Sequence, residues 1–282
     1  MTRIQKEKLF SNFLAALTLF TCFILAFILF AVFSRGFSAL SWEFISSEAT
    51  DFGAQGGILY QIFGTLLLMF ASITICLPIA LGTALYQSEY LKSSLWKKAF
   101  KIFMASLNGM PTIVLGLAGY LFFGKFLGIG VSWLTGALIL AAMILPTAHA
   151  AILEAIETLP EHYQETGISL GLKPNQRILA VVIPHSVYGI ITGALLGLAR
   201  AGGETAAIMF TATAFSGVSI PQSITEPVAT LQTHILILAQ EATNPTALAN
   251  AWGAASVLLG IVFFLILGAK SVRSRLSWEP ER

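Results

Sequence analysis

Two opposite charges, Arg200 and Glu204, stand at the end of a long apolar segment that begins near Ile178. An arginine at the centre of a bilayer costs about 2.5–3.5 kcal/mol on insertion scales, so its side chain must face protein or water. Because residues four apart share a helix face, an ion pair between the two charges could be their whole role. The alternative is chemical: the guanidinium contacts an anion through charge-assisted hydrogen bonds, and Glu204 holds the guanidinium or repels the released anion.

Membrane-spanning helices must position these charges. The 282 residues are 56% hydrophobic and only 11% charged, whereas soluble domains carry about 25% charged residues. The apolar runs are continuous rather than alternating, which favours helices over a closed barrel. A net charge of +2, with dispersed basic residues, gives no indication of nucleic-acid binding. Cys22 and Cys76 fall inside apolar runs and are expected to be small buried side chains, not disulfide or metal ligands.

The apolar runs predict an all-α integral membrane protein with six spans. With both termini in the cytoplasm, most of the 16 lysines and arginines lie inside, as membrane insertion favours. A short surface helix is also expected within 228–239. The predicted spans are 9–33, 58–86, 102–123, 133–152, 178–200 and 251–269, with 89–101 as a loop. The expected divisions are a cytoplasmic N-terminus (1–8), a first span with an external loop (9–57), a transmembrane domain (58–270) and a cytoplasmic tail (271–282).

Three glycines lie on the same stripe as the two charges. At 100° per residue, Gly189, Gly193 and Gly197 fall within about 80° of one another. Arg200 and Glu204 fall inside the same arc of about 80°. Because small residues let helices approach closely, these glycines are expected to serve helix packing.

The segment that carries the charges is too long for one span. A helix over 178–215 would be about 57 Å long, against a hydrocarbon core of about 30 Å. The Gly202-Gly203 pair is the expected break. After it the chain could form a half-helix, a re-entrant segment or an extension beyond the membrane. Broken helices commonly mark the solute site of a transporter.

The loop at 154–177 is expected to be cytoplasmic. Its acids fall largely on one helix face, which a solvated surface would explain, but apolar residues lie among them with no lipid to cover them. Gly171 can end a helix in the left-handed conformation, and Pro174 prevents continuation. Two short helices around a glycine predict a knob that fits a groove on another protein. The acids are Glu154, Glu157, Glu161 and Glu165, and the apolar residues are Ile168, Leu170 and Leu172.

The pattern Glu165-Thr-Gly-x-x-x-Gly171, then nine intervening residues, then Val181-x-Ile-Pro184, resembles the EAA loop of ABC importer permeases. Thr166 and Gly167 stand where that family usually has two alanines. The resemblance covers about 58–269 and implies the type I ABC importer permease fold, with this loop docked on a separate cytoplasmic ATPase dimer. The implied coupling residues are Glu161, Glu165, Thr166, Gly167, Leu170 and Gly171.

Two further strings narrow the resemblance. Arg200-Ala-Gly-Gly-Glu-Thr-Ala206 and Asn108-Gly-Met-Pro-Thr-Ile-Val114-x-Gly116 are similar to segments of PstA-type permeases of phosphate importers. The resemblance implies a homologous permease partner, an external phosphate-binding protein and phosphate as the solute. PstA-type chains usually carry an arginine one turn after the proline of span four, where this chain has His149 near Pro146. His149 could replace that arginine or be an ordinary polar residue near the inner interface. The implied substrate path is Arg200, Glu204, Thr205, Asn108 and Thr112.

No Gly-x-x-x-x-Gly-Lys-Ser/Thr phosphate loop occurs, so ATP–Mg is expected on the partner ATPase. This chain is expected to be a non-catalytic, multi-pass subunit of the bacterial inner membrane, in contact with lipid and binding no cofactor. Two alternatives stay open: a permease for sulfate, molybdate or phosphonate, and a stand-alone ion-coupled transporter or channel. A membrane enzyme is least supported, because the four histidines are scattered and the spans lack paired carboxylates.

Overall fold

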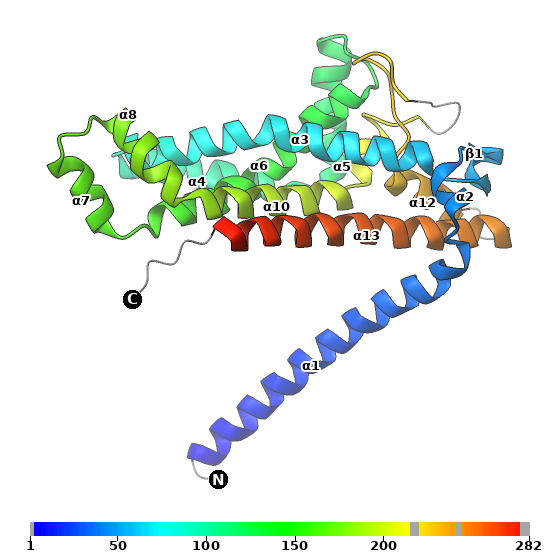
Figure 1. Cartoon of the computed structure of the whole chain (residues 1–282), viewed down its shortest axis with the longest axis horizontal. Helices are drawn as coiled ribbons and strands as arrows, with labels where there is room; N and C mark the ends of the chain where they lie inside the picture. Colours follow the sequence, from blue (N-terminus) through cyan, green and yellow to red (C-terminus); the bar gives the residue numbers. More distant parts are fainter. Residues whose placement is uncertain (1–2, 215–219, 241–243, 277–282) are drawn as a thin grey trace.

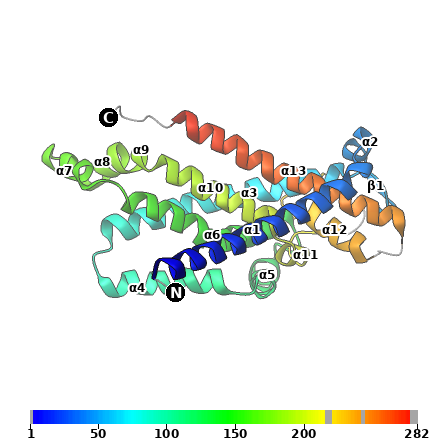
Figure 2. The ribbon, with the colours of Figure 1, turned by 90° about the horizontal axis from the view of Figure 1, so that it is seen from below.

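Three helices form the centre of the structure, a computed structural model that describes residues 3–214, 220–240 and 244–276. They run side by side along the length of an elongated bundle, with helix α4 on one side and helix α13 on the other (Figure 2). The central helices are α3 (Leu59–Leu85), α6 (Trp133–Glu157) and α10 (Val187–Gly203); the flanking helices are α4 (Ser94–Gly109) and α13 (Pro245–Leu276).

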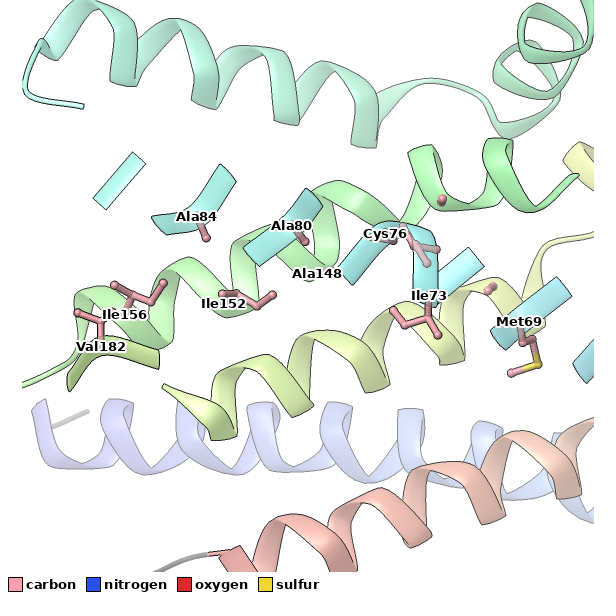
Figure 3. Packing of buried hydrophobic residues seen from close by; sticks show 12 residues of the cluster. Met69, Ile73, Cys76, Ala80, Ala84, Ala148, Ile152, Ile156 and Val182 are labelled. Atoms are coloured by element: carbon pink, nitrogen blue, oxygen red, sulfur yellow. The ribbon is translucent and has the colours of Figure 1, made fainter. Parts of the chain in front are cut away.

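Small side chains bring the central helices together. Ala80 and Ala84 of α3 and Ala148 of α6 are fully buried in one cluster, with Ile152 alongside (Figure 3). Between helices in lipid, close van der Waals packing rather than exclusion of water provides the attraction, so small residues favour association. This packing fixes the positions of α6 and α10, two of the helices that carry the candidate site.

The glycine stripe of α10 packs on the other two central helices. A Cβ on Gly189 would lie 2.0 Å from the Ala155 Cβ, and a Cβ on Gly193 would lie 2.9 Å from the Ala148 carbonyl oxygen. A Cβ on Gly197 would lie 3.0 Å from the Cδ1 of Ile73. Any larger residue at the first two positions would therefore push α10 away from α6.

Gly193→Val is expected to lower the stability of the protein by about 1–3 kcal/mol, because overpacking forces backbone shifts. The measurement is the thermal unfolding midpoint of the purified protein in detergent. Gly260→Ala in α13 is the matched control, because a Cβ there meets no atom within 4 Å among the described residues. An unchanged midpoint for Gly193→Val would show that α10 and α6 do not depend on this close approach.

Six spans are accounted for by four continuous helices and two bent pairs within the described ranges. Helix α4 joins α5 (Thr112–Gly119) and the π-helix η4 (Tyr120–Phe126) at an angle of 99°. The π-helix η5 (Ile178–Val182), with α8 (Pro174–Arg177) before it and α9 (Ile183–His185) after it, joins α10 at 66°. The chain is therefore mostly helical, with two of its spans broken.

The third span predicted at 102–123 is broken, and the loop predicted at 89–101 is wrong in its second half, which is helical. Helix α4 already begins at Ser94, because its lysines can lie along a solvent-facing helix side. The helix ends at Gly109, just before Pro111, which lacks a backbone N–H and restricts the residue before it. The same proline then precedes the first residue of α5, Thr112.

The C-terminal end of helix α1 (Arg3–Gly36) contacts α13, and the N-terminal part of α1 points away from the bundle (Figure 1). There the Ser256 hydroxyl donates to the Val32 carbonyl oxygen at 3.2 Å. The most apolar window of the helix is 0% buried. Such a surface needs lipid or another protein around it.

Short elements lie together at one end of the bundle, which we call the β1 end (Figure 1). The opposite end, which we call the α7 end, carries α7 (Glu161–Ser169) and α8. The β1 end includes a two-stranded antiparallel hairpin that pairs Ala49 with Gly56. Its elements are η1 (Phe37–Ala39), α2 (Trp42–Ser46), β1 (Ala49–Thr50), η2 (Asp51–Gly53), β2 (Gln55–Gly56) and α12 (Leu231–Gln240).

The expectation of a surface helix within 228–239 is wrong in its placement. Helix α12 is present, but Leu231 and Leu238 are fully buried in it. Gln232 and His234 are almost fully buried. The helix packs against α3 and α13, and its polar side chains face inward because other buried polar groups meet them there. Residues 277–282, which belong to the predicted cytoplasmic tail, lie outside the described residues.

Candidate functional site

Arg200 lies in the last turn of α10 and reaches two other helices. Its Nη1 donates to the Asn108 Oδ1 of α4 at 2.5 Å and to the Thr147 Oγ1 of α6 at 2.9 Å. The Arg200 side chain is 26% exposed. The guanidinium is thus fixed where α4 ends, beside the Pro146 of α6 and at the end of α10.

Glu204 lies close to this guanidinium but leaves some of its N–H donors unoccupied. Its Oε1 lies 3.9 Å from the Nε of Arg200, at the limit of an ion pair, and its side chain is 14% exposed. Arginine has five N–H donors in a planar fork that matches oxyanions. Among the described residues, no hydrogen bond engages Nη2 of Arg200, so donors remain for a bound oxyanion.

The helix break after Arg200 is where the glycine pair predicts it. Helix α10 ends at Gly203, Glu204 is extended, and a single short turn, α11 (Ala206–Met209), follows. Helix α11 packs on α5, where a Cβ on Gly116 would lie 2.8 Å from the Cα of Ala207. The break between α4 and α5 and the end of α10 therefore both lie near the arginine.

Gln232 of α12 satisfies the backbone at this break. Its Nε2 donates to the Gly202 carbonyl oxygen at 2.8 Å, a group that the end of α10 leaves without a helical partner. Its Oε1 accepts from the Thr65 hydroxyl of α3 at 3.2 Å, and the Leu231 backbone N–H donates to the same hydroxyl at 2.9 Å. Gln232 and Thr65 thereby hold the end of α10 in place.

Gln232→Leu is expected to destabilise the protein by about 1–3 kcal/mol, because it leaves the buried Gly202 carbonyl oxygen unpaired. Thermal unfolding of the purified protein measures the change. Gln240→Leu is the matched control, since Gln240 is exposed on the same helix. If both variants unfold at the same temperature, Gln232 does not support the break.

The other residues predicted for the substrate path differ in whether they contact Arg200. Asn108 contacts Arg200, whereas Thr112 begins α5 and Thr205 precedes α11. Within the part of the chain that the structure describes, neither threonine hydrogen-bonds to the guanidinium. Thr147 and Gln232 were missed by sequence reasoning. Thr147 is a polar residue in an apolar run, whereas Gln232 stands beside Thr233 and His234 in the segment expected to form a surface helix.

Among the contacts of the described residues, none joins His149 to Arg200. Its Nδ1 lies 3.0 Å from the Thr83 Oγ1 of α3, and its ring packs on Phe100 of α4 at 5.2 Å between centroids. The side chain is buried. Its contacts are those of a satisfied polar residue between α3, α4 and α6 and do not favour its replacing an arginine at the site.

The α7 end presents a helix–glycine–helix unit, as the sequence predicts. Gly171 follows α7 with φ of +72°. Its N–H donates to the Ile168 carbonyl oxygen at 2.9 Å, and the Leu172 N–H donates to that of Gly167 at 3.1 Å, which is the Schellman pattern. Leu170 is 73% exposed at the tip. An apolar residue on a rigid turn is suited to a groove on another protein.

Of the remaining residues predicted for this unit, Glu165 and Thr166 are exposed, and the Thr166 hydroxyl donates to the His162 carbonyl oxygen at 2.6 Å. Glu161 is the first residue of α7. Gly167, in contrast, is buried against Arg177. A Cβ added to Gly167 would lie 3.3 Å from the Cγ of Arg177.

Arg177 connects this unit to α3. Its Nη2 lies 2.5 Å from the Oε2 of Glu89, in the π-helix η3 (Tyr86–Tyr90) that extends α3. The two side chains are 17% and 3% exposed. Nearby, the Tyr90 hydroxyl donates to the Asn175 Oδ1 at 3.3 Å. Two side-chain contacts therefore tie α8 to the end of α3, and sequence reasoning missed both.

Comparison with known proteins places these features in context. Residues 76–275 match the family described as the binding-protein-dependent transport system inner membrane component. A probable ABC transporter permease protein, YqgI of Bacillus subtilis, is 32% identical over 88% of this chain and 89% of its own length. A probable phosphate transport system permease protein, PstA of Methanocaldococcus jannaschii, is 33% identical over 94% of this chain and 92% of its own.

The fold has solved counterparts. A chain of a bacterial ABC transporter involved in the import of the acidic polysaccharide alginate superposes with a TM-score of 0.64, covering 98% of this chain and 100% of the other. The two sequences are 15% identical, so this likeness concerns the fold alone.

Proposed function

Because this chain belongs to the family of binding-protein-dependent transport system inner membrane components, and is an ABC importer permease subunit, we propose that its solute is inorganic phosphate. In this proposal it forms the translocation path with a homologous permease. An external binding protein delivers phosphate, and a cytoplasmic ATPase dimer drives the cycle. Both termini and the α7 end face the cytoplasm.

The Arg200 cluster carries the proposal. A guanidinium oriented by Asn108 and Thr147, with donors remaining, suits a tetrahedral oxyanion. The relative named as a PstA phosphate permease, 33% identical over most of the chain, supports phosphate among the oxyanions. Glu204 either holds the guanidinium in place or repels the anion after release.

Movement reaches the cluster from the α7 end. The ATPase binds α7 and the Gly171 turn, and the Arg177–Glu89 contact passes the displacement to α3. The breaks at Pro111 and after Gly203 are the points at which short segments can reorient beside Arg200. No covalent chemistry is assigned to this chain.

Uptake of radiolabelled phosphate into proteoliposomes tests the proposal. The vesicles hold the complete transporter, with binding protein outside and ATP inside. Uptake should require the ATPase and should be suppressed by excess unlabelled phosphate but not by sulfate, molybdate or a phosphonate. Suppression by one of these anions instead would assign the permease to that anion, and transport without the ATPase would contradict the ATP-driven mechanism.

A further inference from the structure

A cavity of about 720 Å³ lies between α4 and α6 at the α7 end. Its lining starts at Ser94, where α4 begins, and at Glu157, where α6 ends, and it continues inward to Asn108 and Pro146. Asn108 is the residue that accepts a hydrogen bond from Arg200, and Pro146 precedes the other acceptor, Thr147. The cavity thus runs from one end of the bundle to the Arg200 cluster.

One wall of this cavity is basic. Lys97, Lys98 and Lys101 of α4 line it. At 100° per residue, Lys97, Lys101 and Asn108 fall within about 40° of one another, so they form one stripe along α4. Insertion preferences explain why lysines lie near the cytoplasmic end of a span, but they do not explain this alignment along a cavity.

These ammonium groups are free to bind an anion. In the described parts of the chain, none of Lys97, Lys98 and Lys101 forms an ion pair. The acids that line the cavity, Glu154 and Glu157, are on the facing helix and are fewer than the lysines. A lysine is a mobile point charge, which suits weak and transient contact with an oxyanion better than the fixed fork of Arg200 does.

We propose that Lys97, Lys98 and Lys101, with Asn108, form a second and weaker site for a tetrahedral phosphate group on the cytoplasmic side of Arg200. The direction of movement through it rests on the proposed function: the anion leaves Arg200 along the lysine stripe. Phosphate that enters from the cytoplasm occupies the same site and slows further uptake. Inorganic phosphate and the phosphate of an anionic lipid headgroup share the required chemistry.

Protection of the lysines from acetylation tests the site without turnover. The complete transporter, in phosphatidylcholine nanodiscs without ATP, is treated with an acetylating reagent in phosphate or in chloride of equal ionic strength. Mass spectrometry should show that phosphate slows acetylation of Lys97 and Lys101 about threefold or more, while Lys92 and Lys125, which do not line the cavity, react equally. Protection that instead requires phosphatidylglycerol in the nanodisc supports the site with lipid as its occupant. Equal rates for all four lysines in every condition overturn the proposal.

The second measurement is uptake of external phosphate into vesicles that are already loaded with phosphate. The double variant Lys97→Gln with Lys101→Gln should need about five- to tenfold more internal phosphate for half-inhibition if free phosphate is the occupant. The charge-matched control, Lys92→Gln with Lys125→Gln, should behave as wild type. If phosphate protects the lysines but inhibition is unchanged in the double variant, the proposed exit role is wrong. If the wild type takes up no phosphate, the proposed function fails. The acetylation result still tests the lysine site in that case, because it requires no transport.

Discussion

Arg200→Gln should reduce ATP-driven phosphate uptake by a factor of about 100 or more while the complex still assembles. Each hydrogen bond from a charged donor contributes about 1.5–3 kcal/mol, and an oxyanion at Arg200 would lose at least two. Glutamine keeps an N–H donor for Asn108 or Thr147, so the helices should remain in contact. Uptake in proteoliposomes measures the loss, and co-purification with the ATPase checks assembly.

The alternative role for Arg200 is the ion pair with Glu204 alone, and a double variant separates the two. If Arg200→Gln acts only by leaving the Glu204 carboxylate without a cation, then adding Glu204→Gln should restore uptake. We expect no restoration, because the double variant still lacks the anion's donor. Arg200→Lys should be intermediate, since it keeps the charge but loses the planar fork. Wild-type uptake by Arg200→Gln would remove this residue from the path.

Local chemistry accounts for the features that the sequence predicted well. The Gly171 turn was predictable because glycine readily adopts the left-handed conformation that ends many helices, and Pro174 prevents continuation; the Schellman bonds are present. The break at Gly202-Gly203 was predictable from length, because an uninterrupted helix would be about twice the thickness of the hydrocarbon core. Both predictions depend on residues that are neighbours in the chain.

Contacts between distant segments could not be predicted in the same way. Arg200 meets Thr147 across 53 positions, and Gln232 meets Gly202 across 30. The residue type marks Gln232 as a hydrogen-bonding side chain but does not identify the carbonyl oxygen with which it pairs. The start of α4 at Ser94 was missed for a related reason: a lysine-rich stretch has the composition of a loop, yet lysines also suit a helix side that faces a cavity.

Glu89→Gln should uncouple ATP hydrolysis from transport. Glu89 is 3% exposed, and its loss leaves the Arg177 guanidinium, 17% exposed, without its charged partner. Removing one member of a buried pair costs about 3–5 kcal/mol, and here the cost falls on the junction between α8 and the end of α3. We expect the ATPase to remain bound and active while phosphate uptake falls about tenfold or more, since 1.4 kcal/mol at a two-state junction already changes its population tenfold.

The ratio of phosphate transported to ATP hydrolysed measures this uncoupling, which a general loss of stability would not produce. Glu43→Gln is the matched control, because Glu43 is an exposed acid on α2 at the opposite end of the bundle. The charge exchange Glu89→Arg with Arg177→Glu should recover part of the ratio, because it restores opposite charges across the same junction. If Glu89→Gln lowers hydrolysis and uptake in equal proportion, then the contact stabilises the fold without transmitting movement, and the Tyr90–Asn175 contact becomes the next candidate to test at this junction.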